Sequence, residues 1–302
     1  VFPYREPRLI HKISGVVSLL KEKSVSRVMI VTDKGIRGLG LTSPLEELIG
    51  KSGITATVYD GTMPNPTSDN VEEARELYLK NNCQALIAFG GGSAMDCAKA
   101  VGARIVRPKM PLRKMAGLIK VCKRLPLFIA IPTTAGAGSE TTVAAVITDS
   151  ATHRKAAIND PFLIPKYAVL DPELTVGLPP YTTATTGMDA LAHAVEAYTN
   201  HTYNTKLENR LAKEAVKLIH DNILKAFEDG SDLEARQNMQ RGAFYAGRAF
   251  TRGCVGYVHA IGHTLGGLYG VAHGLAMAVL LPHVMKEFGS SAHKRLAELA
   301  DA

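Results

Sequence analysis

The sequence has no apolar run long enough to cross a membrane. Its longest apolar stretches, such as "PLFIAIP" and "GLAMAVLL", are far shorter than the roughly eighteen residues that a membrane-spanning helix needs. It also lacks a segment with signal-peptide character, internal repeats and low-complexity segments. The sequence therefore predicts a soluble globular protein without a membrane partner. The chain opens at Val1 rather than Met, so we expect that a few native residues precede it.

Cysteine is scarce and irregularly placed. The four cysteines, Cys83, Cys97, Cys122 and Cys254, show no paired spacing. Scattered thiols of this kind argue against a disulfide framework and for a reducing compartment. We therefore expect reduced cysteines and a cytoplasmic protein.

Charge is mildly one-sided, with a net charge of +7. The densest basic run, from Lys109 to Arg124, has no aromatic residue between its cations on which a base could stack. Positive charge without stacking residues is typical of a solvated surface. The sequence therefore predicts no nucleic-acid partner.

The first part of the chain alternates strand-like and helix-like segments. A length of 302 residues with 46% hydrophobic residues allows two domains, the usual outcome above about 250–300 residues. Helical patterns at 44–53 and 70–82 separate the earlier strand-like runs, and this alternation predicts an α/β domain with a mostly parallel sheet covered by helices. The predicted strands lie at 27–33, 56–61, 85–92, 127–134 and 167–171.

The character of the sequence changes at Pro179 and Pro180. Beyond them, segments such as 208–227 and 234–250 have helical periodicity, and no run resembles a strand. We therefore predict a dinucleotide-binding α/β domain at 1–179 and an all-helical domain at 180–302.

A glycine-rich turn follows one predicted strand. In "ALIAFGGGSAMDCAKAVG", glycines at the end of a parallel strand let backbone N–H groups approach a phosphate, and the following helix directs its positive end to the same place. Gly91, Gly92 and Ser93 are therefore candidates for binding a pyrophosphate. The alternative is a tight turn in which Ser93 caps the helix.

A second polar loop, "IPTTAGAGSE" (131–140), follows another predicted strand. Loops at the carboxyl ends of neighbouring parallel strands converge on one crevice, where open sheets bind ligands. Asp33, at the end of "RVMIVTD", then accepts hydrogen bonds from a ribose and repels a 2′-phosphate, which favours NAD over NADP; alternatively it only begins a turn before Gly35. The acid precedes the glycines and G-x-G-x-x-G is absent, so the common dinucleotide fingerprint does not apply.

Two helical segments of the second domain carry polar residues among apolar ones. "TGMDALAHAVEAYTNH" places Asp189 and His193 four residues apart, on one helix face. "YVHAIGHTLGGLYGVAHGLAMAVLLPH" contributes His259 and His273. A single histidine in such a segment is more often a hydrogen-bonded core residue. Several imidazoles and a carboxylate in two apolar helices are harder to pair one by one, and a divalent metal can bind them together. Oxygen and nitrogen donors without a thiolate suit Fe(II) or Zn(II), and the spacing does not choose between them.

These stretches together resemble the iron-containing (group III) alcohol dehydrogenases. The matching segments are "FGGGSAMD", "IPTTAGAGSE", "LDPELTVGLPP", "TGMDALAHAVEAY" and "HAIGHTLGGLYGVAHGLAMAVLLPHV", in the family's order over nearly the whole chain. The resemblance implies a metal- and NAD-dependent oxidoreductase that interconverts a short primary alcohol or diol with its aldehyde. The expected partners are that small molecule and further copies of this chain, as a homodimer or larger assembly.

The resemblance also assigns residues. The metal, Fe(II) before Zn(II), is bound by the four residues Asp189, His193, His259 and His273. His263 resembles a histidine near the nicotinamide and becomes the expected catalytic proton relay, and Phe250 lines the substrate channel. The expected cofactor contacts, besides Asp33, are Asn65, Gly91, Gly92, Ser93, Thr133, Thr134, Thr142 and Lys155.

The chain departs from the family pattern at two places. Ala137 replaces a common threonine of the second loop, and the chain stops at "KRLAELADA", where members of the family continue for several helices. We therefore expect a helical domain that is incomplete at its carboxyl end. The alternatives are an enzyme similar to glycerol dehydrogenases or dehydroquinate synthase, which share the metal and NAD architecture, and a non-catalytic nucleotide-binding module.

Overall fold

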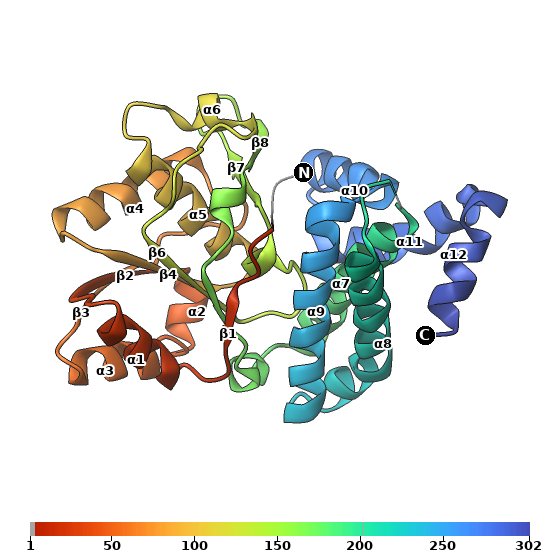
Figure 1. Ribbon diagram of the computed structural model, residues 1–302, viewed down its shortest axis with the longest axis horizontal. Helices are drawn as coiled ribbons and strands as arrows, with labels where there is room; N and C mark the ends of the chain where they lie inside the picture. The colour runs from red at the N-terminus through yellow and green to blue at the C-terminus, as the bar shows by residue number, and fades with distance from the viewer. Residues whose placement is uncertain (1–3, 201) are drawn as a thin grey trace. The chain divides into compact units, whose positions relative to one another are not determined.

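The computed structural model describes residues 4–200 and 202–302 (Figure 1). They form two compact units, of which the first comprises residues up to 133 together with 139–171. The second comprises residues 134–138 and 172–302. No helix in the described ranges is both long and apolar enough to cross a bilayer.

A six-stranded parallel sheet forms the centre of the first unit and confirms the predicted fold class. Strand β4 is buried along its whole length, which is typical of a parallel sheet covered on both faces. In spatial order the strands are β1 (Arg8–Ile10), β9 (Tyr167–Val169), β6 (Leu127–Pro132), β4 (Ala85–Gly90), β2 (Arg27–Val31) and β3 (Thr55–Tyr59).

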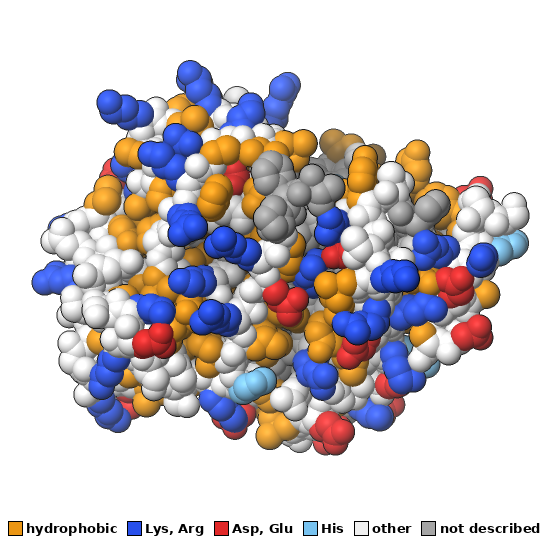
Figure 2. Space-filling model, viewed as in Figure 1, with side chains coloured by type: hydrophobic (Ala, Val, Ile, Leu, Met, Phe, Trp, Pro, Cys, Tyr) orange, Lys and Arg blue, Asp and Glu red, His pale blue; other side chains and the backbone are white. Residues whose placement is uncertain are grey.

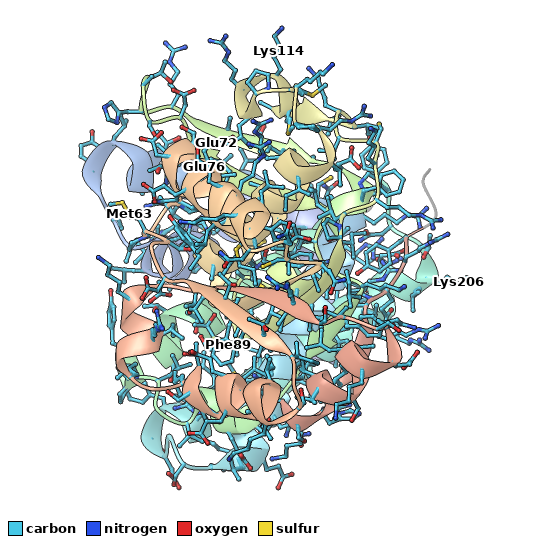
Figure 3. All side chains as sticks on the ribbon, turned by 90° about the vertical axis from the view of Figure 1, so that its left-hand side faces the viewer. Met63, Glu72, Glu76, Phe89, Lys114 and Lys206 are labelled. Atoms are coloured by element: carbon cyan, nitrogen blue, oxygen red, sulfur yellow. The ribbon has the colours of Figure 1, made fainter. Side chains whose placement is uncertain are left out.

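Helices cover both faces of this sheet. Figure 1 shows α1 (Ser14–Glu22) and α3 (Ser43–Lys51) on one side, and α4 (Ser68–Lys80) and α5 (Gly92–Val106) on the other. Phe89, labelled in Figure 3, is fully buried in β4. Glu72 on α4, also labelled there, forms an ion pair with Arg104 on α5, so a charged contact joins the two helices of one face.

Short elements complete the first unit. Helix α2 (Lys34–Gly38) follows β2, and α6 (Leu112–Met115) precedes a three-stranded sheet that the sequence did not predict. That sheet has β5 (Gly117–Leu118) parallel to β8 (Lys155–Asn159) and β7 (Ala144–Thr148) antiparallel to β8. Two 3₁₀ turns, η1 (Ser139–Thr141) and η2 (Pro161–Leu163), lie beside these strands in the chain.

The second unit is helical, as predicted. After the 3₁₀ turn η3 (Pro172–Thr175), three long helices pack side by side (Figure 1): α7 (Pro180–Thr199), α8 (Lys206–Glu228) and α9 (Leu233–Gly253). Three further helices follow: α10 (Tyr257–Tyr269), α11 (His273–Phe288) and α12 (Ser290–Ala300).

Local sequence signals set the helix ends in this unit. Thr205 and Glu208 form a capping box at the start of α8, and the Asp232 side chain caps α9. Gly270 ends α10 with φ +69°, a left-handed conformation that glycine adopts without strain. The chain therefore turns sharply after α10, and His273 becomes the first residue of α11.

Candidate functional site

Asp189 and His193 lie one turn apart on the buried face of α7. Pro180 at the first position of the helix fits a helix start, because proline lacks the N–H that would be unpaired there. Each residue is 6% exposed, and Nε2 of His193 lies 3.9 Å from Oδ1 of Asp189. The four-residue spacing thus produces the shared face that the sequence predicted.

Two further imidazoles approach the same carboxylate oxygen. Nε2 of His259 on α10 lies 3.6 Å from Oδ1 of Asp189, and Nε2 of His273 at the start of α11 lies 3.4 Å from it. His259 is buried, whereas the His273 side chain is 43% exposed. Three helices therefore direct three ring nitrogens at one oxygen.

The polar atoms at this point fit a cation. Oδ1 of Asp189 and Nε2 of His259 are buried and have no hydrogen-bond partner among the described residues. The ligand atoms of Asp189, His193 and His259 all lie within 4.8 Å of one another and could hold a metal ion. Unpaired buried polar groups are costly, and a divalent cation satisfies an oxygen and several nitrogens together. His273 lies outside that group of three but faces the same oxygen.

Charge and burial shift the pKa values of these residues. Burial alone raises the pKa of Asp189, but the neighbouring imidazoles outweigh it and hold the pKa below its usual range. Burial lowers the pKa of His193 to about 3, so its ring is a neutral donor. Burial alone lowers the pKa of His259, but the carboxylates of Asp189 and Glu196 outweigh it and raise the pKa to about 9. A cation at this place competes with that proton.

Glu196 orients His259, and the sequence analysis missed it. Its Oε2 lies 2.5 Å from Nδ1 of His259, and its Oε1 accepts a hydrogen bond of 2.7 Å from the Val258 backbone N–H. Glu196 is 2% exposed. A carboxylate bound to one ring nitrogen fixes the tautomer and turns the other nitrogen towards a metal. The only signal in the sequence was a third polar residue, seven positions after Asp189, in the same apolar helix.

Two aromatic side chains border the four donors. The Phe250 ring stacks on His193 with 4.2 Å between ring centroids, so it fixes the orientation of that imidazole. His263 is exposed and stacks on His273 at 5.1 Å, one turn along α10 from His259. The structure therefore brings His263 beside the predicted metal ligands. Its role as proton relay, and the role of Phe250 in a substrate channel, stay predictions.

The glycine loop lies at the carboxyl end of β4, next to the end of β6. Gly90 pairs with Pro132 in the sheet, and the Thr133 N–H donates a 3.1 Å hydrogen bond to the Gly90 carbonyl. Gly90 has φ +149°, and a Cβ added there would meet the Ala94 Cβ at 2.9 Å, so only glycine fits. The first parts of the two predicted loops are therefore neighbours.

Helix α5 begins at this loop without a side-chain cap. Gly91 is the N-cap residue and Gly92 the first helical residue, so Ser93 lies inside the first turn. The alternative in which Ser93 caps the helix is therefore wrong. Uncapped N–H groups at the positive end of a fifteen-residue helix are a suitable phosphate site.

Asp33 lies at the end of the adjacent strand β2. Its Oδ1 accepts a 2.9 Å hydrogen bond from the Ile36 N–H and caps α2, so the turn interpretation is confirmed. Its other oxygen would lie 3.6 Å from a Cβ placed on Gly90. One carboxylate oxygen thus holds the turn while the other faces the glycine loop, and a ribose contact stays a prediction.

Asn65 and Lys155 contact each other although ninety residues separate them. Nζ of Lys155 donates a 2.7 Å hydrogen bond to Oδ1 of Asn65, whose backbone has φ +58°. The two predicted cofactor residues therefore form one polar pair.

The predicted threonine contacts lie in different settings. Thr133 is buried, and its hydroxyl has no partner among the described residues. Thr134 is half-buried in the segment 134–138, which clusters with the helical unit. The Thr142 hydroxyl accepts a 2.8 Å hydrogen bond from Nζ of Lys99, so a protein side chain already holds it.

Lys99 is a buried cation that the sequence analysis missed. Besides the Thr142 hydroxyl, Ser139 Oγ and the carbonyl oxygens of Thr142 and Ala144 lie 2.8–3.0 Å from its Nζ, so the three N–H groups are shared among four acceptors. Burial lowers its pKa to about 8, against the pull of Asp96 and Glu140. Lys99 therefore fixes the segment after the second loop.

Comparison with known proteins gives one family for both units. Residues 10–172 match the family model described as "Iron-containing alcohol dehydrogenase", and residues 183–302 match "Fe-containing alcohol dehydrogenase family, C-terminal". Alcohol dehydrogenase 4 of Schizosaccharomyces pombe is 43% identical over 283 residues, which cover 93% of this chain and 66% of that protein. The 1,3-propanediol dehydrogenase of Citrobacter freundii is 36% identical over 307 residues, covering 100% of this chain and 79% of that one.

A solved structure is similar over the whole chain. The crystal structure of sulfoacetaldehyde reductase from Bifidobacterium kashiwanohense, in complex with NAD+, superimposes with a TM-score of 0.89 at 30% identity. The match covers 100% of this chain and 80% of that chain. Across these comparisons, the chain spans between about two thirds and four fifths of the length of the proteins it matches.

Proposed function

The chain belongs to the iron-containing alcohol dehydrogenase family, and from that premise we propose that it transfers a hydride between a short primary alcohol or diol and NAD. The reaction interconverts the alcohol and its aldehyde. The observation that carries the proposal is the convergence of His193, His259 and His273 on Oδ1 of Asp189, with buried atoms that have no hydrogen-bond partner in the described part of the chain.

We propose that these four residues bind the metal, Fe(II) before Zn(II). When bound, the metal acts as a Lewis acid that lowers the pKa of the substrate hydroxyl. Asp189 supplies the negative charge, and the neutral His193 ring supplies a nitrogen donor that Phe250 holds in place. Glu196 keeps the Nε2 atom of His259 turned to the same point.

His263 is proposed to pass the released proton to solvent. It is exposed and its ring stacks on His273, so it connects the donor cluster with bulk water. An imidazole titrates near neutral pH and suits such a relay.

The cofactor is proposed to bind at the carboxyl ends of β2, β4 and β6. The uncapped start of α5, with Gly91, Gly92 and Ser93, takes the pyrophosphate, and Asp33 accepts hydrogen bonds from a ribose. The remaining proposed contacts are those of Asn65, Thr133, Thr134, Thr142 and Lys155.

The test is NADH formation with ethanol, 1-propanol, 1,3-propanediol and glycerol after anaerobic reconstitution with Fe(II) or Zn(II). We expect turnover that requires the metal and is lost in Asp189→Ala. His263→Gln should reduce kcat and flatten its pH dependence. His220→Gln on α8 is the matched control, because that ring is 83% exposed and should leave kcat unchanged.

A nucleotide-binding module without activity is the rival. It predicts NAD binding in titration calorimetry with no turnover of any alcohol, although metal is bound. That outcome would exclude the oxidoreductase proposal.

A further inference from the structure

A cavity of about 980 Å³ lies at the amino ends of the parallel strands of the first unit. Its lining includes Val25 and Gln84, which precede β2 and β4, together with Leu127 at the start of β6. The proposed nucleotide site lies at the other end of these strands. A strand of six residues spans roughly 20 Å, so the cavity is separate from that site.

The lining combines apolar walls with an excess of positive charge. Five cationic side chains line it: Arg5, Arg8, Lys23, Arg124 and Lys166. Only two carboxylates do so, those of Glu6 and Asp160. Figure 2 shows Lys and Arg side chains gathered around hydrophobic ones on the face where β1 lies in Figure 1.

The Asp160 carboxylate is already occupied by backbone donors. It is fully buried and accepts hydrogen bonds from the Val121, Cys122 and Phe162 N–H groups at 2.9–3.0 Å. These bonds hold both carboxylate oxygens in the wall, and Asp160 forms no ion pair with the cations of the lining among the described residues. Arg8 and Arg124 form no ion pair with any described residue.

The apolar part of the lining is rigid and mostly aliphatic. Leu125, Leu127 and Ile164 contribute branched side chains, and three prolines at 126, 161 and 165 limit backbone movement. Ile119, in the same lining, has φ +54°, a conformation that a β-branched residue rarely adopts. The Asp160 carboxylate accepts the Val121 and Cys122 N–H groups and so holds the loop that follows Ile119. Unusual backbone held by specific contacts is found at ligand sites more often than elsewhere.

We propose that this cavity binds an anionic amphiphile, a carboxylate with an apolar chain of medium length. The chain fills the space between Leu125, Leu127 and Ile164, and the head group pairs with Arg8 and Arg124. The volume lies within the range of small-molecule pockets and leaves ample room for such a chain. A second copy of this chain presenting the same cationic face would be repelled. A nucleotide base needs polar partners at its edges. The lining offers only two neutral hydroxyl or amide side chains, those of Ser24 and Gln84, so it fits a nucleotide poorly.

The probe for this site is 11-(dansylamino)undecanoate, whose fluorescence rises in apolar surroundings. We expect decanoate to displace it, and methyl decanoate, which has the same chain without the charge, to do so at least tenfold less effectively. The double variant Arg8→Gln, Arg124→Gln should bind the probe at least tenfold more weakly. Saturating NAD should not displace it.

The matched control is Lys80→Gln, Lys114→Gln, which removes two exposed cations of the same unit outside the cavity. Lys114 extends into solvent in Figure 3. Equal thermal unfolding of both double variants shows that each is folded. Equal probe affinity in both variants, displacement by NAD, or binding to anionic vesicles without binding of decanoate would each overturn the proposal.

Discussion

Glu196 and His259 form a buried pair in which one carboxylate holds both a side chain and the backbone of another helix. One oxygen contacts Nδ1 of His259, and the other accepts the Val258 N–H in the first turn of α10. Gly256, the N-cap residue of that helix, leaves room for the pair, since a Cβ there would meet Oε1 of Glu196 at 2.9 Å. The position of His259 on α10 thus depends on α7.

Glu196→Gln tests this dependence. The amide keeps the size of the side chain but weakens the contact with Nδ1, so His259 is less firmly oriented and less basic. We expect metal affinity to fall roughly 10- to 100-fold, measured by competition with a chelator. The control is Glu234→Gln, at an exposed position on α9. An equal loss of metal affinity in both variants would show that the contact between Glu196 and His259 does not affect metal binding.

Asp33→Ser tests the basis of the expected preference for NAD. Serine keeps a capping oxygen for α2 but removes the negative charge that faces the glycine loop. We expect kcat/KM with NADP to rise relative to NAD, with little change in stability. An unchanged ratio of the two kcat/KM values would mean that Asp33 only caps the helix.

Lys99→Met tests the buried ammonium group. Methionine fills a similar volume but leaves the buried acceptors of the three N–H groups unsatisfied, so we expect a loss of about 1–3 kcal/mol or more in the free energy of unfolding, measured with urea. Lys114→Met at the surface should change this free energy by no more than about 0.5 kcal/mol. If both variants unfold at the same urea concentration, the hydrogen bonds of Lys99 contribute little.

Cysteine alkylation tests the packing of the sheet. Burial raises the pKa of the Cys97 thiol to about 12, and burial also raises the pKa of Cys83. Cys122 and Cys254 are exposed. Iodoacetamide at pH 8 should therefore modify Cys122 and Cys254 in the native protein and all four cysteines in urea, as counted by mass spectrometry. Rapid modification of Cys97 without urea would mean that α5 is not packed on the sheet.

Sequence patterns predicted most of the sheet and the donors because each leaves a local signal in the chain. Buried parallel strands appear as apolar runs, and Asp189 and His193 have the four-residue spacing of one helix face. The strand predicted at 85–92 ends at Gly90, because Gly91 is the N-cap residue of α5 and Gly92 its first helical residue. Four strands were not predicted: β1 and β5 have only three and two residues, and β7 and β8 are alanine-rich segments of five residues each.

Glu196 and Lys99 could not be assigned in the same way. A single carboxylate or ammonium group in an apolar helix has no spacing of its own, and its partners lie 40–63 residues away in the chain. Their roles depend on tertiary contacts that periodicity does not encode. The sequence showed only a polar residue in an apolar segment, and the structure showed that it is buried and what it contacts.

The central claim is that Asp189, His193, His259 and His273 surround one cation. X-ray absorption at the iron or zinc edge, on anaerobically reconstituted protein with its metal content measured, tests it most directly. We expect about one metal per chain with nitrogen and oxygen donors and no sulfur, and loss of that metal in Asp189→Ala but not in His220→Ala. Sulfur donors, or a metal content that Asp189→Ala and His259→Ala leave unchanged, would contradict the account.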